Sequence, residues 1–504
     1  MKKIFYSLLL GFSLQLNAQI QQVSSFSTGK LEYAYPLENA EKEIIGYAFI
    51  YNKGLDHSQT KINHEYVLLD KNLNRLTNGD YEMNFHQKFD YYLNKILFNN
   101  GKLNINYSIN KGKNNEQYGF LHIVKDLKSG ETESKKHIGY DFVSPELDTK
   151  TLSKTGGIYK GKSIHFMRLD VVPNDSDFNI LTTSAYLDPG YRYVFSNFTA
   201  YGNNYSKVLT TGELMPKNSL MQVFNYGDSK NQKMVIYRND VKMKMVGSDE
   251  VISEGIKLID VKSGKQISNF KYNQNRQYYS LPSMEFLDDK ITVIGEMKTG
   301  FKNLSNYARD LPTIGVRRTV IDDKGKFLVD KELLFKDIYK EFGFIGTKRD
   351  DDGSKYKLID TFNFDDLSYT VLFEKSNSNL FKNSTVNDFI LSNFDHQGNL
   401  INSYLINKNK ALFSSTNTYL FSQLDRENKE ILFYYLDTEG NNQKEYNTIL
   451  INKVKNGELK QEKINVKTNG NTIKIYKAQY GYFIVIEIDR NGNTNGIRLE
   501  RVNL

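Results

Sequence analysis

Side-chain oxygens recur at every second position near the C-terminus, at Asp489, Asn491, Asn493 and Asn495. This spacing is typical of calcium-binding loops, in which alternate residues turn their oxygens toward one ion. Such loops place Gly at the sixth position, whereas Gly492 is the fourth residue counted from Asp489. The stretch therefore favours a plain Asn-rich hairpin, with a calcium loop as the alternative.

Two other acidic stretches have a similar composition. One contains Asn174, Asp175 and Asp177, and the other runs from Asp350 to Asp352. Short clusters of like charge are usually exposed to water. We interpret both stretches as solvated turns.

The seven histidines are spread singly along the chain, at positions 57, 64, 86, 122, 137, 165 and 396. None of them has the close spacing that lets a strand or a helix present two imidazoles to one metal ion. His64-Glu65 begins like a metalloprotease helix, but the second His is absent and the segment has the pattern of a strand. We therefore expect no metal site and no cofactor.

Motifs of covalent catalysis are absent as well. There is no Gly-x-Ser-x-Gly elbow, and the chain contains no Cys. Gly156-Gly157 precedes a strand-like run rather than a helix N-terminus, so it lacks the context of a phosphate loop. A carboxylate pair of the glycosidase kind is assembled from distant loops and leaves no local motif, so it stays open. No catalytic residue is assigned.

Aromatic residues gather in the segment 189–205 around Arg192. The rings belong to Tyr191, Tyr193, Phe195, Phe198, Tyr201 and Tyr205. On a strand, the alternation of the first three would place them on one face. Tyr together with Arg is enriched at binding hot spots. A core without Trp must also be filled by Tyr and Phe, however, so core packing is favoured over a binding face.

These residues need a scaffold, and a recurring turn indicates its kind. An apolar strand ends in Asp, and Gly follows after two or three variable residues. The turn occurs in VKDLKSG (124–130), LIDVKSG (258–264), VIDDKG (320–325), NFDHQG (393–398), YLDTEG (435–440) and EIDRNG (487–492). Asp bonds to nearby backbone N–H groups and Gly supplies the positive φ of tight hairpins, so these segments are predicted hairpin tips.

Most apolar runs are short, β-branched or aromatic, which predicts strands. Clear cases are 43–51, 64–70, 102–109, 118–124, 233–238, 290–297, 367–374, 430–436 and 482–488. One exception is 330–342, where Leu334, Ile338 and Phe342 recur every four residues and predict a short amphipathic helix.

The turns recur about every 65 residues, which predicts a repeated four-stranded unit and hence an all-β single β-propeller of seven or eight blades. The Gly positions that define the interval are 130, 202, 264, 325, 398 and 457, and a further unit lies at 68–76, where Asn stands in for Gly. We expect seven blades, with the strands between Thr472 and Val502 sharing a closing blade with a strand near Lys30 to Tyr35. Two or three separate β-sandwiches are the alternative, although no linker divides the chain.

The N-terminus has the pattern of an export signal: Lys2 and Lys3, an apolar stretch from Ile4 to Leu16, and Ala18 before the expected cleavage. We predict a signal peptide over 1–18 and one propeller domain over 19–504. Without Cys the protein cannot be a lipoprotein, and no later stretch is apolar enough for a membrane span. We expect a periplasmic or extracellular location.

The charge pattern argues against one class of partner. Removing Lys2 and Lys3 from the 67 basic residues leaves 65 against 59 acidic residues. The basic residues are scattered, with no stripe of the kind that binds nucleic acid.

On its export signal and turn spacing, the chain resembles exported β-propeller proteins of Gram-negative bacteria, many of them functionally uncharacterised. The resemblance implies no particular site residue. The hypothesis that fits best is a non-enzymatic binding or scaffold protein that holds a partner protein or a surface glycan on a propeller rim. The alternative is an extracytoplasmic polysaccharide hydrolase with carboxylates at the central channel.

Overall fold

The structure is a computed structural model. It describes residues 27, 29–38, 43–84, 89–111, 116–138, 158–159, 162–173, 178–188, 190–199, 205–215, 219–226, 233–242, 250–260, 265–271, 283–287, 290–298, 313–338, 355–377, 385–408, 419–437, 446–467 and 471–504. The chain forms two compact units. The first comprises Met1–Gln87 with Asn417–Leu504, and the second comprises Lys88–Thr416.

The first unit contains three antiparallel sheets, each with its strands in chain order. One sheet is formed by β1 (Lys30–Glu38), β2 (Ile44–Leu55), β3 (Lys61–Asp70) and β4 (Arg75–Asn84). Another is formed by β26 (Tyr419–Asp425), β27 (Glu430–Asp437), β28 (Tyr446–Lys455) and β29 (Glu458–Lys467). The third has only β30 (Thr472–Lys477), β31 (Tyr482–Ile488) and β32 (Thr494–Arg501).

The second unit contains five sheets of the same meander type. The first sheet is formed by β5 (Phe89–Asn99), β6 (Lys102–Lys111), β7 (Glu116–Asp126) and β8 (Thr132–Ile138). The second is formed by β9 (Ile158–Tyr159), β10 (Lys162–Pro173), β11 (Phe178–Asp188), β12 (Gly190–Thr199) and β13 (Tyr205–Met215). The next is formed by β14 (Ser219–Tyr226), β15 (Lys233–Lys242), β16 (Glu250–Asp260) and β17 (Gln266–Lys271). The last two are formed by β18 (Ser283–Leu287), β19 (Lys290–Lys298), β20 (Thr313–Asp322) and β21 (Phe327–Leu334), and by β22 (Lys355–Asn363), β23 (Tyr369–Asn377), β24 (Thr385–Phe394) and β25 (Leu400–Asn407).

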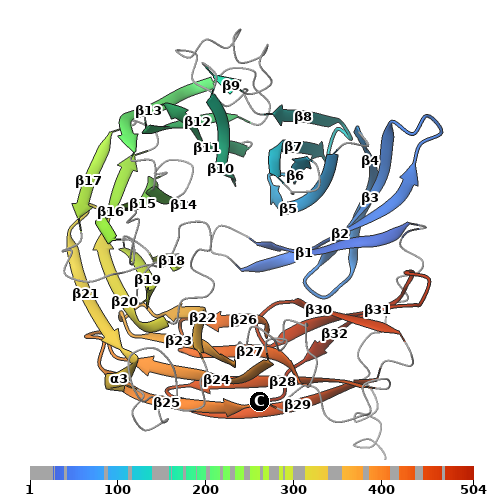
Figure 1. Ribbon diagram of the computed structural model, residues 1–504. Helices are drawn as coiled ribbons and strands as arrows, with labels where there is room; N and C mark the ends of the chain where they lie inside the picture. Colours follow the sequence, from blue (N-terminus) through green and yellow to red (C-terminus); the bar gives the residue numbers. More distant parts are fainter. Residues whose placement is uncertain are drawn as a thin grey trace, which may run out of the picture. The chain divides into compact units, whose positions relative to one another are not determined.

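The repeated unit is the four-stranded antiparallel blade of a β-propeller, as the turn spacing predicts (Figure 1). Seven of the eight described sheets have four long strands, because the extra strand β9 in one of them is only two residues long. The eighth sheet, β30–β32, has three. The all-β β-propeller prediction is confirmed. The division into one domain over 19–504 stays a prediction.

The predicted closing blade is wrong in its strand pairing. The strand near Lys30 is β1, and it pairs with β2 in a sheet of its own rather than with the C-terminal strands. The strands after Thr472 pair with one another, β30 with β31 and β31 with β32. Turn spacing predicts the number of strands, but it does not predict with which strand an edge strand pairs.

The helix predicted over 330–342 is wrong over its first part. Residues up to Leu334 belong to β21, which pairs with β20 along its whole length. Phe335–Ile338 are helical, as the short helix α3, and residues 339–342 lie outside the described residues. The residues of β21 also alternate between exposed and covered, which is the period of a strand. Both a helix and a strand fit this sequence, and hydrogen bonding to β20 selects the strand.

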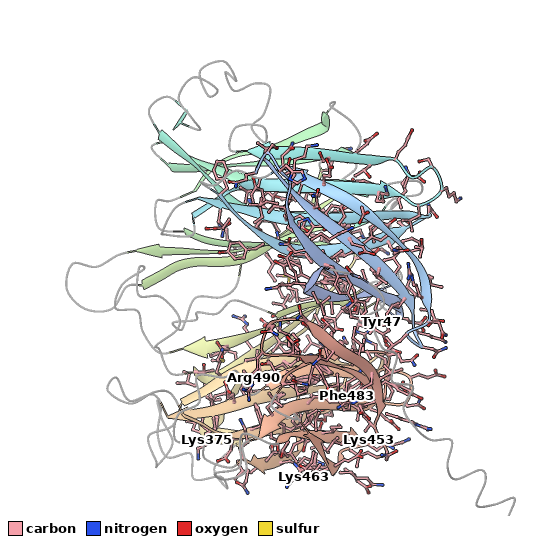
Figure 2. The ribbon with its side chains drawn as sticks, turned by 90° about the vertical axis from the view of Figure 1, so that its right-hand side faces the viewer. Tyr47, Lys375, Lys453, Lys463, Phe483 and Arg490 are labelled. Carbon is pink, nitrogen blue, oxygen red and sulfur yellow. The ribbon has the colours of Figure 1, made fainter. Side chains whose placement is uncertain are left out.

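The core of the first unit is built on both faces of β31. Ile484 and Ile486 pack into a cluster with Tyr47 and Phe49 of β2. The intervening Phe483 and Val485 pack into a second cluster with residues of β27 and β28, among them Leu432, Tyr434, Ile449 and Ile451. Tyr47 and Phe483 are labelled in Figure 2. Alternate residues of one central strand thus join the sheet to two neighbours.

The second unit is packed in the same way. Ile294 and Val316 of one sheet contact Tyr369, Val371 and Phe373 of the next, together with Phe335 from α3. A further cluster joins Val235, Ile256 and Leu258 to Ile291, Val293 and Ile321. Tyr and Phe are among the largest fully buried side chains described in both units, as a Trp-free core requires.

Three of the repeated Asp turns share one hydrogen-bond pattern, whereas Asp126, whose turn is one residue longer, accepts at Oδ1 from the N–H groups of Lys128 and Ser129. At Asp395, the Gly398 N–H donates to the backbone carbonyl of Asp395 (3.0 Å), and the Asn399 N–H donates to its Oδ1 (2.8 Å). Asp322 and Asp489 hold their turns in the same way. The turn glycines have φ between 77° and 86°, at Gly130, Gly325, Gly398 and Gly492. The predicted hairpin tips are therefore confirmed at these positions.

The turn at 70–74 departs from the expectation that Asn replaces Gly. Leu73 takes the positive φ, at 68°. Asn74 instead donates its side-chain amide to Asp70 Oδ2 (2.9 Å) while its N–H donates to Asp70 Oδ1 (2.8 Å). The buried side chain of Leu73 packs into the core cluster of Tyr47, which offsets the strain of its backbone.

The two ends of each sheet differ in their connections. In a meander of four strands, the first and third connections lie at one end, which we call the hairpin end, and the second lies at the other, which we call the loop end. The longest connection at the hairpin ends is 227–232. The loop ends include 243–249, 299–312, 378–384 and 438–445, and the chain also leaves each sheet for the next from this end, for example over 139–157.

Candidate functional site

The stretch from Asp489 to Asn495 forms the β31–β32 hairpin, as its sequence favours. Both carboxylate oxygens of Asp489 are engaged: Oδ1 accepts from the N–H groups of Asn491 and Asn493 (both 2.8 Å), and Oδ2 accepts from the Asn493 side chain (3.2 Å). Glu500 stands where a calcium loop would place its closing Glu. It lies on β32 and accepts from Arg498 Nε (2.6 Å). The oxygens of this loop hold a turn together.

Several predicted positions lie outside the described residues. They are Asn174, Asp175, Asp177, Asp350 to Asp352, Gly156-Gly157, the export signal, Tyr201 and His86. Tyr191, Tyr193 and Phe195 alternate along strand β12, as predicted, and Phe198 lies in the same strand. The side chains of all four are outside the described part. The choice between a core role and a binding role for these rings stays a prediction.

His64 lies in a polar row across the sheet β1–β4. In the sheet register, His64 lies opposite Asn52 of β2 and opposite Tyr81 of β4. The Tyr81 ring stacks on the imidazole, with 5.0 Å between the ring centroids. Nε2 of His64 lies 3.3 Å from Oε2 of Glu32, and the Asn52 amide donates to Oε1 of Glu32 (2.7 Å). Burial raises the pKa of Glu32, but the bonds from His64 and Asn52 outweigh it and lower the pKa.

This row explains the sequence feature His64-Glu65 without a metal. Both residues lie on strand β3, so their side chains point to opposite faces of the sheet. Across the described ranges, no three His, Cys, Asp or Glu side chains converge as a metal ion would need.

The most unusual acidic group of the described residues is Glu374, near the loop end of β23. It is 7% exposed, and its Oε1 has no hydrogen-bond partner among the described atoms. Lys357 of β22 lies directly opposite it in the sheet register, and Phe389 of β24 lies opposite on the other side. A buried carboxyl with a free oxygen is a candidate proton donor or ligand-binding group.

The charges around Glu374 are basic. Burial raises the pKa of Glu374, and the positive charges of Lys357 and Lys408 oppose that rise without cancelling it. Lys408 is itself buried, with Nζ 5.2 Å from the centroid of the Phe389 ring, and its N–H donates to Asp388 Oδ1 (3.1 Å). Glu374 is therefore a buried carboxyl beside two lysines, with a pKa above its ordinary value.

A second glutamate at the loop end, Glu296 of β19, has a different role. Its Oε1 accepts from the Leu358 N–H (2.6 Å) and from Thr313 Oγ1 (3.1 Å). Glu296 therefore joins β19 to β20 and to the first strand of the next sheet. It positions the loop end of β22, which carries Lys357.

Sequence reasoning missed Glu374 and had little chance of finding it. It lies inside the apolar run LSYTVLFE (367–374), at its last position, where a charged residue normally marks the end of a buried strand. In the structure, β23 continues to Asn377, so Glu374 lies inside the strand rather than after its end.

No protein-family model matches the chain, and no curated protein matches it. Among solved structures it is similar to the polysaccharide lyase Uly1, at 9% identity and a TM-score of 0.40, over 81% of this chain and 89% of the lyase. It is also similar to a mutant of the NanB sialidase from Streptococcus pneumoniae, at 7% identity and a TM-score of 0.33, over 96% and 97% of the two chains. A Synechocystis apocarotenoid oxygenase mutant gives 8% identity and a TM-score of 0.35, over 83% and 95%. At these levels the likeness concerns the fold alone.

Within the described ranges, no helix has the length and apolarity that a membrane-spanning helix needs.

Proposed function

We propose that this protein is an exported, non-enzymatic binding protein that holds a surface glycan or a partner protein at the loop ends of its blades. The observation that carries the proposal is the difference between the two ends. The hairpin ends are closed by short turns, and the loop ends carry the long connections. Binding residues are concentrated on loops that a rigid scaffold positions.

The polar groups at the hairpin ends support this choice of face. The turn carboxylates of Asp70, Asp322 and Asp395 accept hydrogen bonds from their own backbone, so little of their bonding capacity is left for a ligand. The loop end of β22–β25 instead presents Lys357 and Lys375 beside the buried Glu374. Lys375 is labelled in Figure 2.

Charge-matched variants test the face. Lys357→Gln with Lys375→Gln removes two positive charges from a loop end, and Lys324→Gln with Lys326→Gln removes two from the exposed hairpin 323–326. Binding of purified protein to surface polysaccharides and envelope proteins of the source cells is measured by calorimetry. We expect the first pair to weaken binding at least several-fold and the second to leave it unchanged. Equal losses in both variants would remove the loop-end assignment.

The extracytoplasmic location is part of the same proposal. The basic start, the apolar stretch and Ala18 support cleavage between Ala18 and Gln19. The intact mass of the protein recovered from the periplasm or medium should match a chain beginning at Gln19. Recovery of a chain that retains Met1 from the cytoplasm alone would contradict it.

One observation favours the alternative, an extracytoplasmic polysaccharide hydrolase. Burial raises the pKa of Glu374, which is the direction that a general acid requires. Such a hydrolase needs a second carboxylate at a distance of about 5–10 Å. Release of reducing ends from envelope polysaccharides, abolished by Glu374→Gln and retained by Glu458→Gln, would establish the alternative and displace the binding role.

A further inference from the structure

Arg318 of β20 is a buried cation without a hydrogen-bonded partner. It is 1% exposed, and its Nε, Nη1 and Nη2 all lack an acceptor among the described atoms. Its register neighbours are Ile294 of β19 and Lys331 of β21, so it lies on the face of its sheet that packs against β22–β25. Its guanidinium carbon lies 4.2 Å from the centroid of the Tyr369 ring.

Arg317, the preceding residue, shows the ordinary arrangement. Its Nε and Nη2 donate to the two carboxylate oxygens of Asp330 (2.8 and 2.7 Å), the bidentate geometry that suits a guanidinium. The two adjacent arginines lie on opposite faces of one strand, and they differ in burial and in their hydrogen-bonded partners. One has a carboxylate and the other does not.

Other buried polar atoms without a described partner lie on strands β19, β22 and β23. Tyr369 is 1% exposed, and its hydroxyl lacks a partner among the described residues. Asn363 lies beside Tyr369 in the sheet register, and it donates Nδ2 to Glu285 Oε2 (2.8 Å) while its Oδ1 accepts nothing that is described. Thr292, opposite Glu285 in the register, has a buried hydroxyl without a described partner. All these residues belong to the second unit.

The positive charge of Arg318 is only partly compensated. The exposed carboxylate of Asp366 attracts it, but burial is the larger effect and lowers the pKa of Arg318. An isolated buried ion is very costly, and arginine cannot escape that cost by losing its proton. Tyr369 does not supply the counter-charge, because burial raises its pKa and keeps the hydroxyl neutral. The neutral hydroxyls of Tyr369 and Thr292 can each donate one hydrogen, as well as accept one, whereas the guanidinium can only donate. Most of the unpartnered groups therefore offer hydrogens.

From this geometry we propose that Arg318, Tyr369 and Thr292 form a binding site for a small monovalent inorganic anion between the sheets β18–β21 and β22–β25. The anion accepts from the guanidinium and the two hydroxyls and neutralises the buried charge. Lys331 closes the site toward the outer strand, since its Nζ donates to the Gln397 carbonyl (2.9 Å) and to Asn399 Oδ1 (3.0 Å) of the neighbouring turn. The anion is part of the folded structure, and this assignment does not depend on the proposed ligand of the loop ends.

The probe is chloride, compared with gluconate at constant ionic strength. The thermal midpoint of the mature protein is measured by intrinsic fluorescence over a range of chloride concentrations. An ion that binds only the folded state raises the midpoint by mass action. We expect a rise of several degrees with rising chloride. The rise should vanish in Arg318→Met and persist in Arg317→Met, which removes a neighbouring arginine that already has its carboxylate.

A second variant covers the case in which Arg318→Met does not fold. Tyr369→Phe keeps the charge and removes one donor, so the chloride response should shift to higher concentration. Crystals grown in bromide should show its anomalous signal beside Arg318. Equal midpoints in chloride and gluconate, as ordered water alone would give, overturn the proposal. So does a chloride response of unchanged size in both Arg318→Met and Tyr369→Phe, or bromide crystals without a signal at the site.

Discussion

Glu430 and Glu374 lie on the second strands of two blades, at opposite ends. Glu430, at the hairpin end of β27, contacts Lys453 Nζ (2.9 Å) and Lys455 Nζ (2.5 Å) and accepts from the Tyr480 hydroxyl (3.0 Å). Burial raises the pKa of Glu430, but these three donors outweigh it and lower the pKa to about 2. Glu374, at the loop end of β23, keeps an unpartnered oxygen and a raised pKa.

The difference shows how the fold divides its polar groups. A carboxylate surrounded by donors stabilises the folded state, and its charge is no longer available. A buried carboxyl with a free oxygen costs stability and keeps its capacity to bind or to donate a proton. The hairpin ends contain the first kind, and the loop end of β22–β25 contains the second.

The largest effect is expected at Gln423, which lies near the hairpin end of β26. Its amide nitrogen donates to the carbonyls of Ala478 (2.8 Å), Gln479 (3.0 Å) and Tyr482 (2.7 Å). Its oxygen accepts from the Tyr434 hydroxyl (2.8 Å) and the Gly481 N–H (3.1 Å). Gln423→Ala leaves these groups buried without a partner and should cost about 3–5 kcal/mol of unfolding free energy.

Chemical denaturation measures that loss. Gln397→Ala is the control, because Gln397 is exposed and its side chain accepts one bond, from Nδ2 of the exposed Asn399 (3.3 Å). The control should cost about 1 kcal/mol or less. Similar losses in the two variants would contradict a hairpin end held by saturated polar groups.

Glu430→Gln should cost about 2–3 kcal/mol at pH 7, because it leaves Lys453 without its carboxylate in a mostly buried position. The folded-state pKa of Glu430 is lowered from 4.5 to about 2, so its contribution is complete above pH 4.5 and is lost as the pH falls toward 2. The difference between wild type and variant should shrink over that window in urea titrations. A difference that stays constant over that window for Glu430→Gln would refute the assignment.

The strands that sequence predicts well are the central ones. The apolar runs 43–51, 290–297, 367–374 and 430–436 correspond to β2, β19, β23 and β27, the second strands of their blades. Central strands are covered on both faces, so they have continuous apolar runs. Outer strands such as β29, with the sequence ELKQEKINVK, are covered on one face only and have no such run. Their existence follows from the turns, not from their own composition.

The candidate groups were not predictable in this way. Glu374 and Arg318 are single polar residues within strands, and their significance depends on which residues the adjacent strand or sheet places against them. Nothing local distinguishes Arg318 from Arg317. Asp489 was predictable because its partners lie within four residues of it in the chain.

Glu374→Gln should change the free energy of unfolding in the opposite direction to Glu430→Gln. Because the folded-state pKa of Glu374 is raised above its usual 4.5, the ionised group destabilises the fold at neutral pH, and this penalty disappears as the pH falls below 4.5. The variant should be more stable than wild type by about 1 kcal/mol or less at pH 7, and equal to it near pH 4. A loss of stability at pH 7 would show that Glu374 is paired, like Glu430, and the contrast between the two ends would not hold.

The smallest effect is expected at the hairpin of Asp489, whose carboxylate is saturated by its own turn. Chelation of calcium should leave the thermal midpoint unchanged, because Asp489 Oδ1 already accepts from two backbone N–H groups and Oδ2 from Asn493. Asp489→Ala should lower the midpoint slightly, since it releases those N–H groups to water at the protein surface. The lowering should be the same with and without a chelator. If the chelator alone lowered the midpoint by several degrees and Asp489→Ala abolished that response, the loop would bind calcium. The carboxylates of the Asp322 and Asp395 turns would then have to be reconsidered as ligands, because they share its hydrogen-bond pattern.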